Sequence, residues 1–161
     1  MNIKEATEKD FDGIWPIFSE VVKSGDTYAY PQNITKENAL KVWIHEPSKT
    51  FIVEENNNIV GTYYLKKNQS GPGSHVCNCG YMVASSARGK GIASAMCEHS
   101  QKIALELGYK AMQFNFVAST NKGAIGLWNK LGFKTAGCLP KAFNHPSEGF
   151  VDALVMFKWL E

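Results

Sequence analysis

The 161-residue sequence has little net charge and no long hydrophobic run. Its formal net charge is +2 and its lysines are scattered, which excludes a basic footprint for nucleic acid or an anionic membrane surface. The first residues, Met1 to Glu5, are charged from the start and no apolar stretch follows them. We therefore expect neither a signal peptide nor a membrane anchor. These absences predict a cytoplasmic protein whose partner is a small, discrete molecule.

Cysteine is scarce and follows no disulfide or metal-binding spacing. Cys77 and Cys79 form a Cys-x-Cys pair close to His75, whereas Cys97 and Cys138 add no Cys-x-x-Cys motif. Residues two apart in a strand share one face, so this trio would form a line instead of closing a tetrahedron. We expect free thiols that behave as small buried hydrophobes in a reducing compartment, and no metal.

Strand and helix patterns alternate along the chain, with no internal repeat or low-complexity tract. The length and the 44% hydrophobic content predict one domain over residues 1–161. Alternation in the middle of the chain implies parallel neighbours there, with antiparallel meanders at the flanks. The predicted strands cover residues 2–6, 51–53, 59–65, 76–83, 111–117, 133–138 and 150–159, and the predicted helices cover 11–22, 35–44, 92–107 and 121–131.

A glycine-rich turn, residues 87–93, connects a predicted strand to a predicted helix. Glycine lets the backbone approach a ligand closely, and the first N–H groups of a helix lack partners, so phosphate oxygens suit this position. The turn is not a Walker A loop, because Ala84 stands at the first glycine position and Gly91 where the magnesium-binding hydroxyl belongs. It nearly meets the dinucleotide fingerprint, but residues 110–116 hold no carboxylate for the ribose.

A second block follows, in which Asn121 and Ala124 open a helix that ends in Gly132-Phe133. Arg-x-x-Gly-x-Ala, formed by Arg88 to Ala93, together with Asn-x-x-Ala and the Gly-Phe exit, resembles the GNAT superfamily of N-acetyltransferases over essentially the whole chain. The resemblance implies a mixed α/β fold: a mostly antiparallel sheet with one parallel pair splayed at its middle, flanked by about four helices. It also implies acetyl-CoA as the cosubstrate and a small-molecule amine as the acceptor.

The resemblance further assigns roles to the two blocks. In the family, the first turn holds the coenzyme pyrophosphate through main-chain amides, and the Asn and Ala of the second block lie beside the pantetheine arm. Main-chain N–H groups at the end of the central strand bind the pantetheine and acetyl oxygens. The implied coenzyme-binding residues are Met82, Val83, Arg88, Gly89, Lys90, Gly91, Ile92, Ala93, Asn121, Ala124 and Trp128.

Two proton carriers that many family members use are absent. Asn78 stands where they have a carboxylate, and Trp128 stands where they have a tyrosine. The coenzyme A thiol, with a pKa of about 8.5, can leave as a thiolate without an acid to protonate it. Asn78 cannot take the proton of the amine, but its amide oxygen can accept an N–H bond while an ordered water carries the proton outward. We predict Asn78 and Asn115 as the catalytic pair; a bridge between strands is the alternative for each.

Short motifs refine the acceptor. The two asparagines, residues 74–78 and residues 25–28 resemble the azetidine-2-carboxylate N-acetyltransferases, which implies a small amino or imino acid as acceptor. Asp26, Thr27 and Tyr28 would then form one wall of its site. A phosphinothricin-type enzyme, a protein N-terminal acetyltransferase and a non-catalytic acyl-CoA sensor stay open, as does a homodimer. The other polar candidates are His75 and His145 for the proton, and Lys66, Lys67 and Lys141 for a substrate carboxylate.

Overall fold

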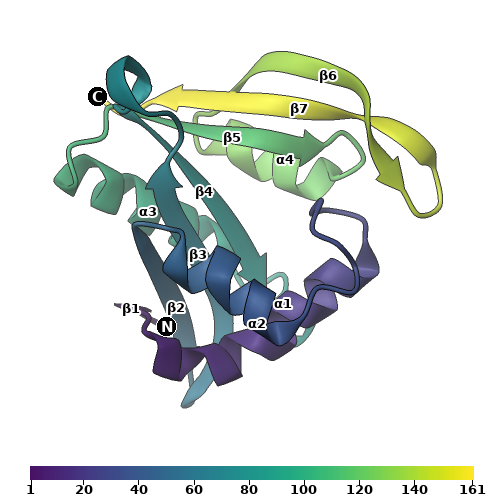
Figure 1. Ribbon diagram of the computed structural model, residues 1–161. Coiled ribbons are helices and arrows are strands. Elements are labelled where there is room, and N and C mark those ends of the chain that lie inside the picture. The colour runs from purple at the N-terminus through teal and green to yellow at the C-terminus, as the bar shows by residue number, and fades with distance from the viewer.

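The computed structural model describes residues 1–161 and contains one twisted seven-stranded sheet with helices on both faces (Figure 1). The strand order is β1-β2-β3-β4-β5-β7-β6, and every neighbouring pair is antiparallel except β4 and β5. The strands are β1 (Asn2–Glu5), β2 (Lys49–Glu55), β3 (Asn58–Lys67), β4 (Val76–Val83), β5 (Ala111–Ala118), β6 (Lys134–His145) and β7 (Gly149–Trp159). The α-helices are α1 (Phe11–Ser24), α2 (Lys36–Leu40), α3 (Ile92–Glu106) and α4 (Lys122–Lys130).

The fold confirms the predicted mixed sheet and its splayed parallel pair. β4 and β5 pair only at Val76 with Ala111 and at Cys77 with Met112, and beyond this point the two strands separate. One hydrophobic cluster packs α1 and α2 on one face of the sheet, and a second packs α3 and α4 on the other. The separation of β4 from β5 therefore leaves an opening in the middle of the sheet, between the two helical layers (Figure 1).

Helix α1 begins and ends at signals that are visible in the sequence. Thr7 and Asp10 form a capping box around a short 3₁₀ turn, and the apolar residues of the helix then face the sheet. Gly25 ends the helix with φ of 67°, a left-handed conformation that glycine adopts without a steric penalty. This termination turns the chain directly into the loop at residues 26–30, which forms part of the site described below.

The second predicted helix is shorter than expected. Thr35 caps α2 by accepting the Asn38 N–H, but after Leu40 the chain widens into a π-helical turn, Lys41–His45. This turn carries Trp43 into the core, where its indole N–H donates to the Thr62 hydroxyl at 3.0 Å. The α-helix therefore gives way to a π-helical turn at the place where the large Trp43 side chain packs into the core.

The C-terminal hairpin is longer than predicted. β6 extends from Lys134 to His145, although the sequence predicted a strand that ends at Cys138. Past the predicted end, β6 includes Pro140 and contains an irregularity between Leu139 and Phe143, where Lys141 has φ of 52°. Edge strands tolerate proline and bulges, because one side of such a strand has no ladder to maintain.

Candidate active site

A cleft of about 670 Å³ occupies the opening where β4 and β5 separate. Its walls come from β4, β5, the loop at residues 26–30, the start of α3 and the α4 helix. Most of its lining side chains are hydrophobic, with a few polar groups placed among them, as is typical of small-molecule sites. Asp26 is the one carboxylate in the lining, and Arg88 is the one cationic side chain.

The main chain of β4 presents alternate residues to the cleft. The C=O of Val76 and the N–H of Ala84 bond to the β3 side, through Asn68 and Val60, whereas the N–H and C=O of Tyr81 bond to a side chain across the cleft. Because successive strand residues point their main-chain groups to opposite edges, the odd-numbered residues face the opening. The Val83 N–H therefore faces the cleft.

This alternation corrects the expectation for Met82. Its N–H belongs to the even-numbered set and points toward β3, where Met82 pairs in register with Thr62. The Met82 side chain is buried and lines the cleft, so the residue contributes apolar surface in place of a main-chain donor. The cleft-facing N–H groups of β4 are those of the odd-numbered residues, and of these the Tyr81 N–H already donates to the Tyr28 hydroxyl.

The glycine-rich turn has the geometry of an anion cradle. Gly89 and Gly91 have φ of 76° and 78°, and a Cβ added at either position would point into open space. The first hydrogen bond of α3 runs from the Ala95 N–H to the Gly91 C=O, so the three preceding N–H groups of the helix have no backbone acceptor. Unpaired amides at a helix N-terminus suit the oxygens of a phosphate or pyrophosphate.

The predicted residues of this turn divide into two kinds. Arg88 and Lys90 are exposed, whereas the Ile92 side chain is buried in the core and leaves only its amide to the turn. Glu20 from α1 supports the turn by accepting the Ser85 N–H at 3.3 Å. Hydrogen bonds from Ser85, followed by the charge of Arg88, lower the pKa of Glu20, so its carboxylate stays ionised beside the turn.

Helix α4 forms the third wall. The Asn121 side chain caps it by accepting the Ala124 N–H at 3.3 Å, and both residues line the cleft. Trp128 is buried and also lines the cleft, where it packs against Tyr81 and Phe114 with ring centroids 5.1 Å from each. Trp128 therefore supplies packing and no acidic group.

The fourth wall is the loop that follows α1. Asp26, Thr27 and Tyr28, for which the sequence predicts an acceptor wall, all line the cleft. The Tyr28 hydroxyl accepts the Tyr81 N–H and donates to the Tyr81 C=O, both at 2.8 Å, so it fastens this loop to β4. Burial raises the pKa of Tyr28 well above its ordinary value, and burial with the nearby Glu46 charge raises the pKa of Tyr30 to about 12. Both phenols therefore stay neutral at physiological pH.

We compared the chain with known protein families. Residues 11–133 match the model of the acetyltransferase (GNAT) family. The chain belongs to this family.

Several relatives resemble this GNAT chain closely. N-acetyltransferase aca1 of Schizosaccharomyces pombe is 36% identical over 107 residues, which cover 66% of this chain and 51% of that protein. The chain thus spans about half the length of this curated relative. A GCN5-related N-acetyltransferase from Kribbella flavida is 37% identical with a TM-score of 0.92, over 98% of this chain and 96% of that one. A GNAT superfamily phosphinothricin acetyltransferase from Sinorhizobium meliloti, in complex with acetyl-CoA, shares the fold at 20% identity, with a TM-score of 0.85 over 98% and 87% of the two chains.

The structure gives the two predicted asparagines of this GNAT chain different surroundings. Asn78 is 5% exposed and is not part of the cleft surface. Its amide oxygen accepts the Tyr64 hydroxyl, and its amide nitrogen donates to the Gln113 C=O, both at 2.9 Å. Asn115 is exposed and lines the cleft. The expectation that both amides face the acceptor is therefore corrected for Asn78, whose amide bonds to Tyr64 and to the main chain of Gln113 and does not line the cleft.

Asn115 is held in place by its neighbours. Its amide oxygen accepts from Gln113 at 2.9 Å and its nitrogen donates to Asn68 at 2.7 Å. β5 gains one residue relative to β7 between Phe114 and Val117, so Asn115 lies within a β-bulge. One donor and one acceptor of its amide stay free for a ligand.

No histidine lines the cleft, and Cys79 is the one cysteine that does. His75 packs near Trp159, and His145 accepts N–H groups of its own turn, so neither lines the cleft. No group of three or more His, Cys, Asp or Glu side chains forms a metal-binding cluster. All four cysteines are free, and Cys138 is exposed, contrary to the expectation of buried thiols. No helix in the structure has the length and apolar character needed to span a bilayer.

Proposed function

We propose that the protein transfers the acetyl group of acetyl-CoA to the amine of a small amino or imino acid. The observation that supports this most strongly is the junction of two features: the cleft-facing edge of β4, which β5 leaves unpaired beyond Cys77, runs toward the start of α3, whose first N–H groups have no backbone acceptor. A pantetheine arm can add to such an edge as a short strand would, while the pyrophosphate lies on the helix amides. The chain's GNAT membership agrees with this ligand.

In this proposal one end of the cleft, formed by residues 87–93 and the end of β4 and called the carrier end, binds the coenzyme and so positions its thioester. The amides of the glycine turn and of the first turn of α3, with Arg88 beside them, hold the pyrophosphate. The Val83 N–H on the cleft-facing edge of β4 faces the thioester, while the Tyr81 N–H stays bonded to the Tyr28 hydroxyl. A preorganised N–H group near the carbonyl oxygen stabilises the negative charge that develops when the amine attacks.

At the acceptor end, the neutral amine attacks the carbonyl carbon and the coenzyme leaves as a thiolate. Asn115 accepts one N–H of the amine and so aligns its lone pair. The proton that the nitrogen releases passes to a water molecule. That water can leave the cleft past Asp26, the one carboxylate in the lining. Tyr28 holds its loop against β4 while this happens.

Asn78 acts as a positioning residue in this proposal. Its two hydrogen bonds fix the Tyr64 hydroxyl and the C=O of Gln113 at the point where the parallel strands separate. Tyr64 in turn forms part of the cleft surface. Asn78 therefore sets the shape of the acceptor end without contacting the amine.

An acceptor screen tests the proposal. Thiol release from acetyl-CoA would be followed with azetidine-2-carboxylate, proline analogues, phosphinothricin, polyamines and short peptides. We expect turnover with the small amino and imino acids and much less with peptides. Preferred turnover of peptides would contradict the acceptor class, and saturable binding of acetyl-CoA without release by any acceptor would identify an acyl-CoA sensor instead.

A further inference from the structure

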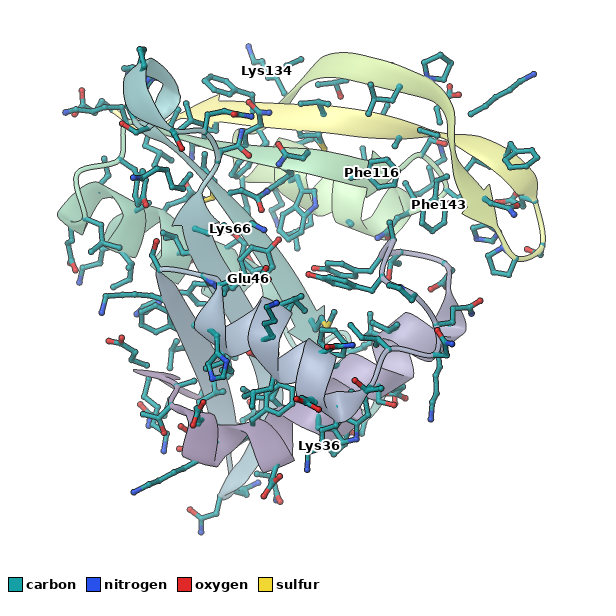
Figure 2. The ribbon with its side chains drawn as sticks, viewed as in Figure 1. Lys36, Glu46, Lys66, Phe116, Lys134 and Phe143 are labelled. Atoms are coloured by element: carbon teal, nitrogen blue, oxygen red, sulfur yellow. The ribbon has the colours of Figure 1, made fainter.

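Lys66 lies outside the cleft lining but against Tyr64, which belongs to it, and it has no acidic partner within the protein. It lies on β3, is half-buried, and extends its ammonium group over the ring of Tyr64 at 5.1 Å from the centroid. The molecule contains six ion pairs, and none includes Lys66. Figure 2 shows the side chain in the middle of the molecule, near the opening between the α1–α2 layer and the strands β5 to β7.

The neighbours of Lys66 are neutral hydrogen-bonding groups. Lys66 pairs in register with Asn78 on β4, so the two side chains share one face of the sheet. Asn78 leads to Gln113, and Gln113 leads to Asn115 on the cleft wall, through the hydrogen bonds described above. The chain of amides continues to Asn68 on the β3 side. This face thus combines one unpaired positive charge with amide groups that can donate to an anion.

The two acidic side chains considered as possible partners of Lys66, those of Asp26 and Glu46, lie on elements other than β3. Asp26 belongs to the loop that follows α1. Glu46 follows the π-helical turn, and its charge contributes to the raised pKa of Tyr30. Neither forms an ion pair with Lys66. The aromatic face stabilises the half-buried ammonium, and a ligand carboxylate would stabilise it more strongly because the two would form a charge-assisted hydrogen bond.

We propose that Lys66 binds the carboxylate of the acceptor and so selects amino and imino acids over simple amines. This inference rests on the proposed function and specifies how its acceptor is recognised. With the carboxylate held on the β3 side, the amine of a small amino acid is directed away from Lys66 and toward Asn115 and the thioester. A larger or uncharged amine would lack this anchor.

The test compares two lysines that are adjacent in the chain. Lys66→Met removes the charge and keeps most of the length of the side chain. Lys67→Met is the matched control, because Lys67 is exposed and belongs to the opposite face of β3. Each variant would be assayed with azetidine-2-carboxylate and proline, and with azetidine and pyrrolidine, which have the same ring amines without the carboxylate.

We expect Lys66→Met to raise KM for the two carboxylate acceptors about tenfold or more, as loss of a charged hydrogen bond predicts. Its KM for azetidine and pyrrolidine should stay unchanged, and Lys67→Met should match the wild type with all four. Lys66→Glu should weaken the carboxylate acceptors further. Equal losses for both kinds of acceptor would show a structural role and overturn the assignment, as would no loss at all.

Product binding separates this inference from the proposed function. N-acetylproline would be titrated into the CoA-loaded protein by calorimetry, which requires no turnover. Affinity that falls at least about tenfold in Lys66→Met and not in Lys67→Met supports carboxylate recognition even if no acceptor in the screen is acetylated. Turnover by the wild type of carboxyl-free amines alone would keep acetyl transfer and overturn the role of Lys66.

Discussion

The two ends of the cleft differ in whether main-chain groups or side chains form them. At the carrier end, the groups that we propose meet the coenzyme are main-chain amides, placed by two left-handed glycines and by the start of α3. At the acceptor end, the groups that we propose meet the ligand are side chains from three separate elements: Tyr28 from a loop, Lys66 from β3, which lies against the lining residue Tyr64, and Asn115 from β5. One end depends on backbone conformation, and the other on how distant parts of the chain pack together.

This difference separates what is shared from what is particular. A main-chain cradle tolerates many side chains as long as the glycine conformations are kept, so it can serve every family member that uses the same carrier. A pocket made of side chains can change its preference with a single substitution. We therefore expect mutations at the carrier end to remove coenzyme binding altogether, and mutations at the acceptor end to change turnover or selectivity while coenzyme binding persists.

The largest effect is expected for Gly91→Val. A branched side chain at φ of 78° is strained by about 1–2 kcal/mol, and its Cβ would project into the open space of the cradle. Acetyl-CoA binding, measured by calorimetry, should be lost while the circular dichroism spectrum stays that of a folded protein.

Gly108→Val is the matched control for this variant. Gly108 follows the other end of α3, has φ of 88°, and likewise has no atom within 4 Å of an added Cβ. It should lower the melting temperature to a similar extent and leave acetyl-CoA affinity unchanged. If both variants lost coenzyme binding equally, strain in α3 would explain the result and the cradle would not.

The next effect distinguishes the two asparagines. Asn78→Ala leaves the buried Tyr64 hydroxyl without its acceptor, so we expect a loss of about 1–3 kcal/mol in unfolding free energy together with lower kcat. Asn115→Ala removes an exposed side chain, so stability should change by less than about 0.5 kcal/mol while kcat/KM for the acceptor falls. Both should bind acetyl-CoA as the wild type does. Normal turnover in Asn115→Ala would remove that residue from the acceptor site.

The carrier end was the part that could be predicted from sequence. Gly89 and Gly91 stand out because few other residues adopt positive φ, and Asn121 is recognisable as a helix cap. These are local signals, which depend on a few consecutive residues. The strand and helix order followed from the same kind of local pattern, as did the parallel pair in the middle of the sheet.

The acceptor end could be predicted only in part, because its geometry depends on long-range pairing. The direction of the Met82 amide follows from the register of β4 against β3, which no local pattern contains. The exposure of Asn115 depends on a bulge set by the pairing of β5 with β7, and the partner of Asn78 is a tyrosine from another strand. The end of β6 was predicted too early, at Cys138, and the strand continues through Pro140 because an edge strand accommodates proline.

A moderate effect is expected for Tyr28→Phe, which tests whether the acceptor loop must be fastened to β4. The substitution removes both hydrogen bonds to Tyr81 and keeps the ring that stacks on Tyr30. A net loss of about 0.5–1.5 kcal/mol corresponds to a two- to tenfold fall in kcat/KM for the acceptor. The Kd for acetyl-CoA should not change. A weaker coenzyme affinity with unchanged acceptor kinetics would place Tyr28 at the carrier end and break the division of the cleft.

The smallest effect lies outside the cleft, at His99 on α3. The Tyr63 hydroxyl contacts its Nδ1 at 2.7 Å, and burial, followed by the charge of Lys102, lowers the pKa of the imidazole below its ordinary value. The unfolded chain therefore takes up a proton before the folded one as pH falls below about 6.5, and stability decreases through that window down to the folded pKa. His99→Gln should flatten this slope in urea titrations between pH 7 and 5, whereas His75→Gln, at an exposed position, should keep it. Because His99 touches neither end of the cleft, His99→Gln should leave acetyl-CoA affinity and acceptor KM unchanged at pH 7. A change in either would show that α3 couples its buried face to the cradle at its N-terminus.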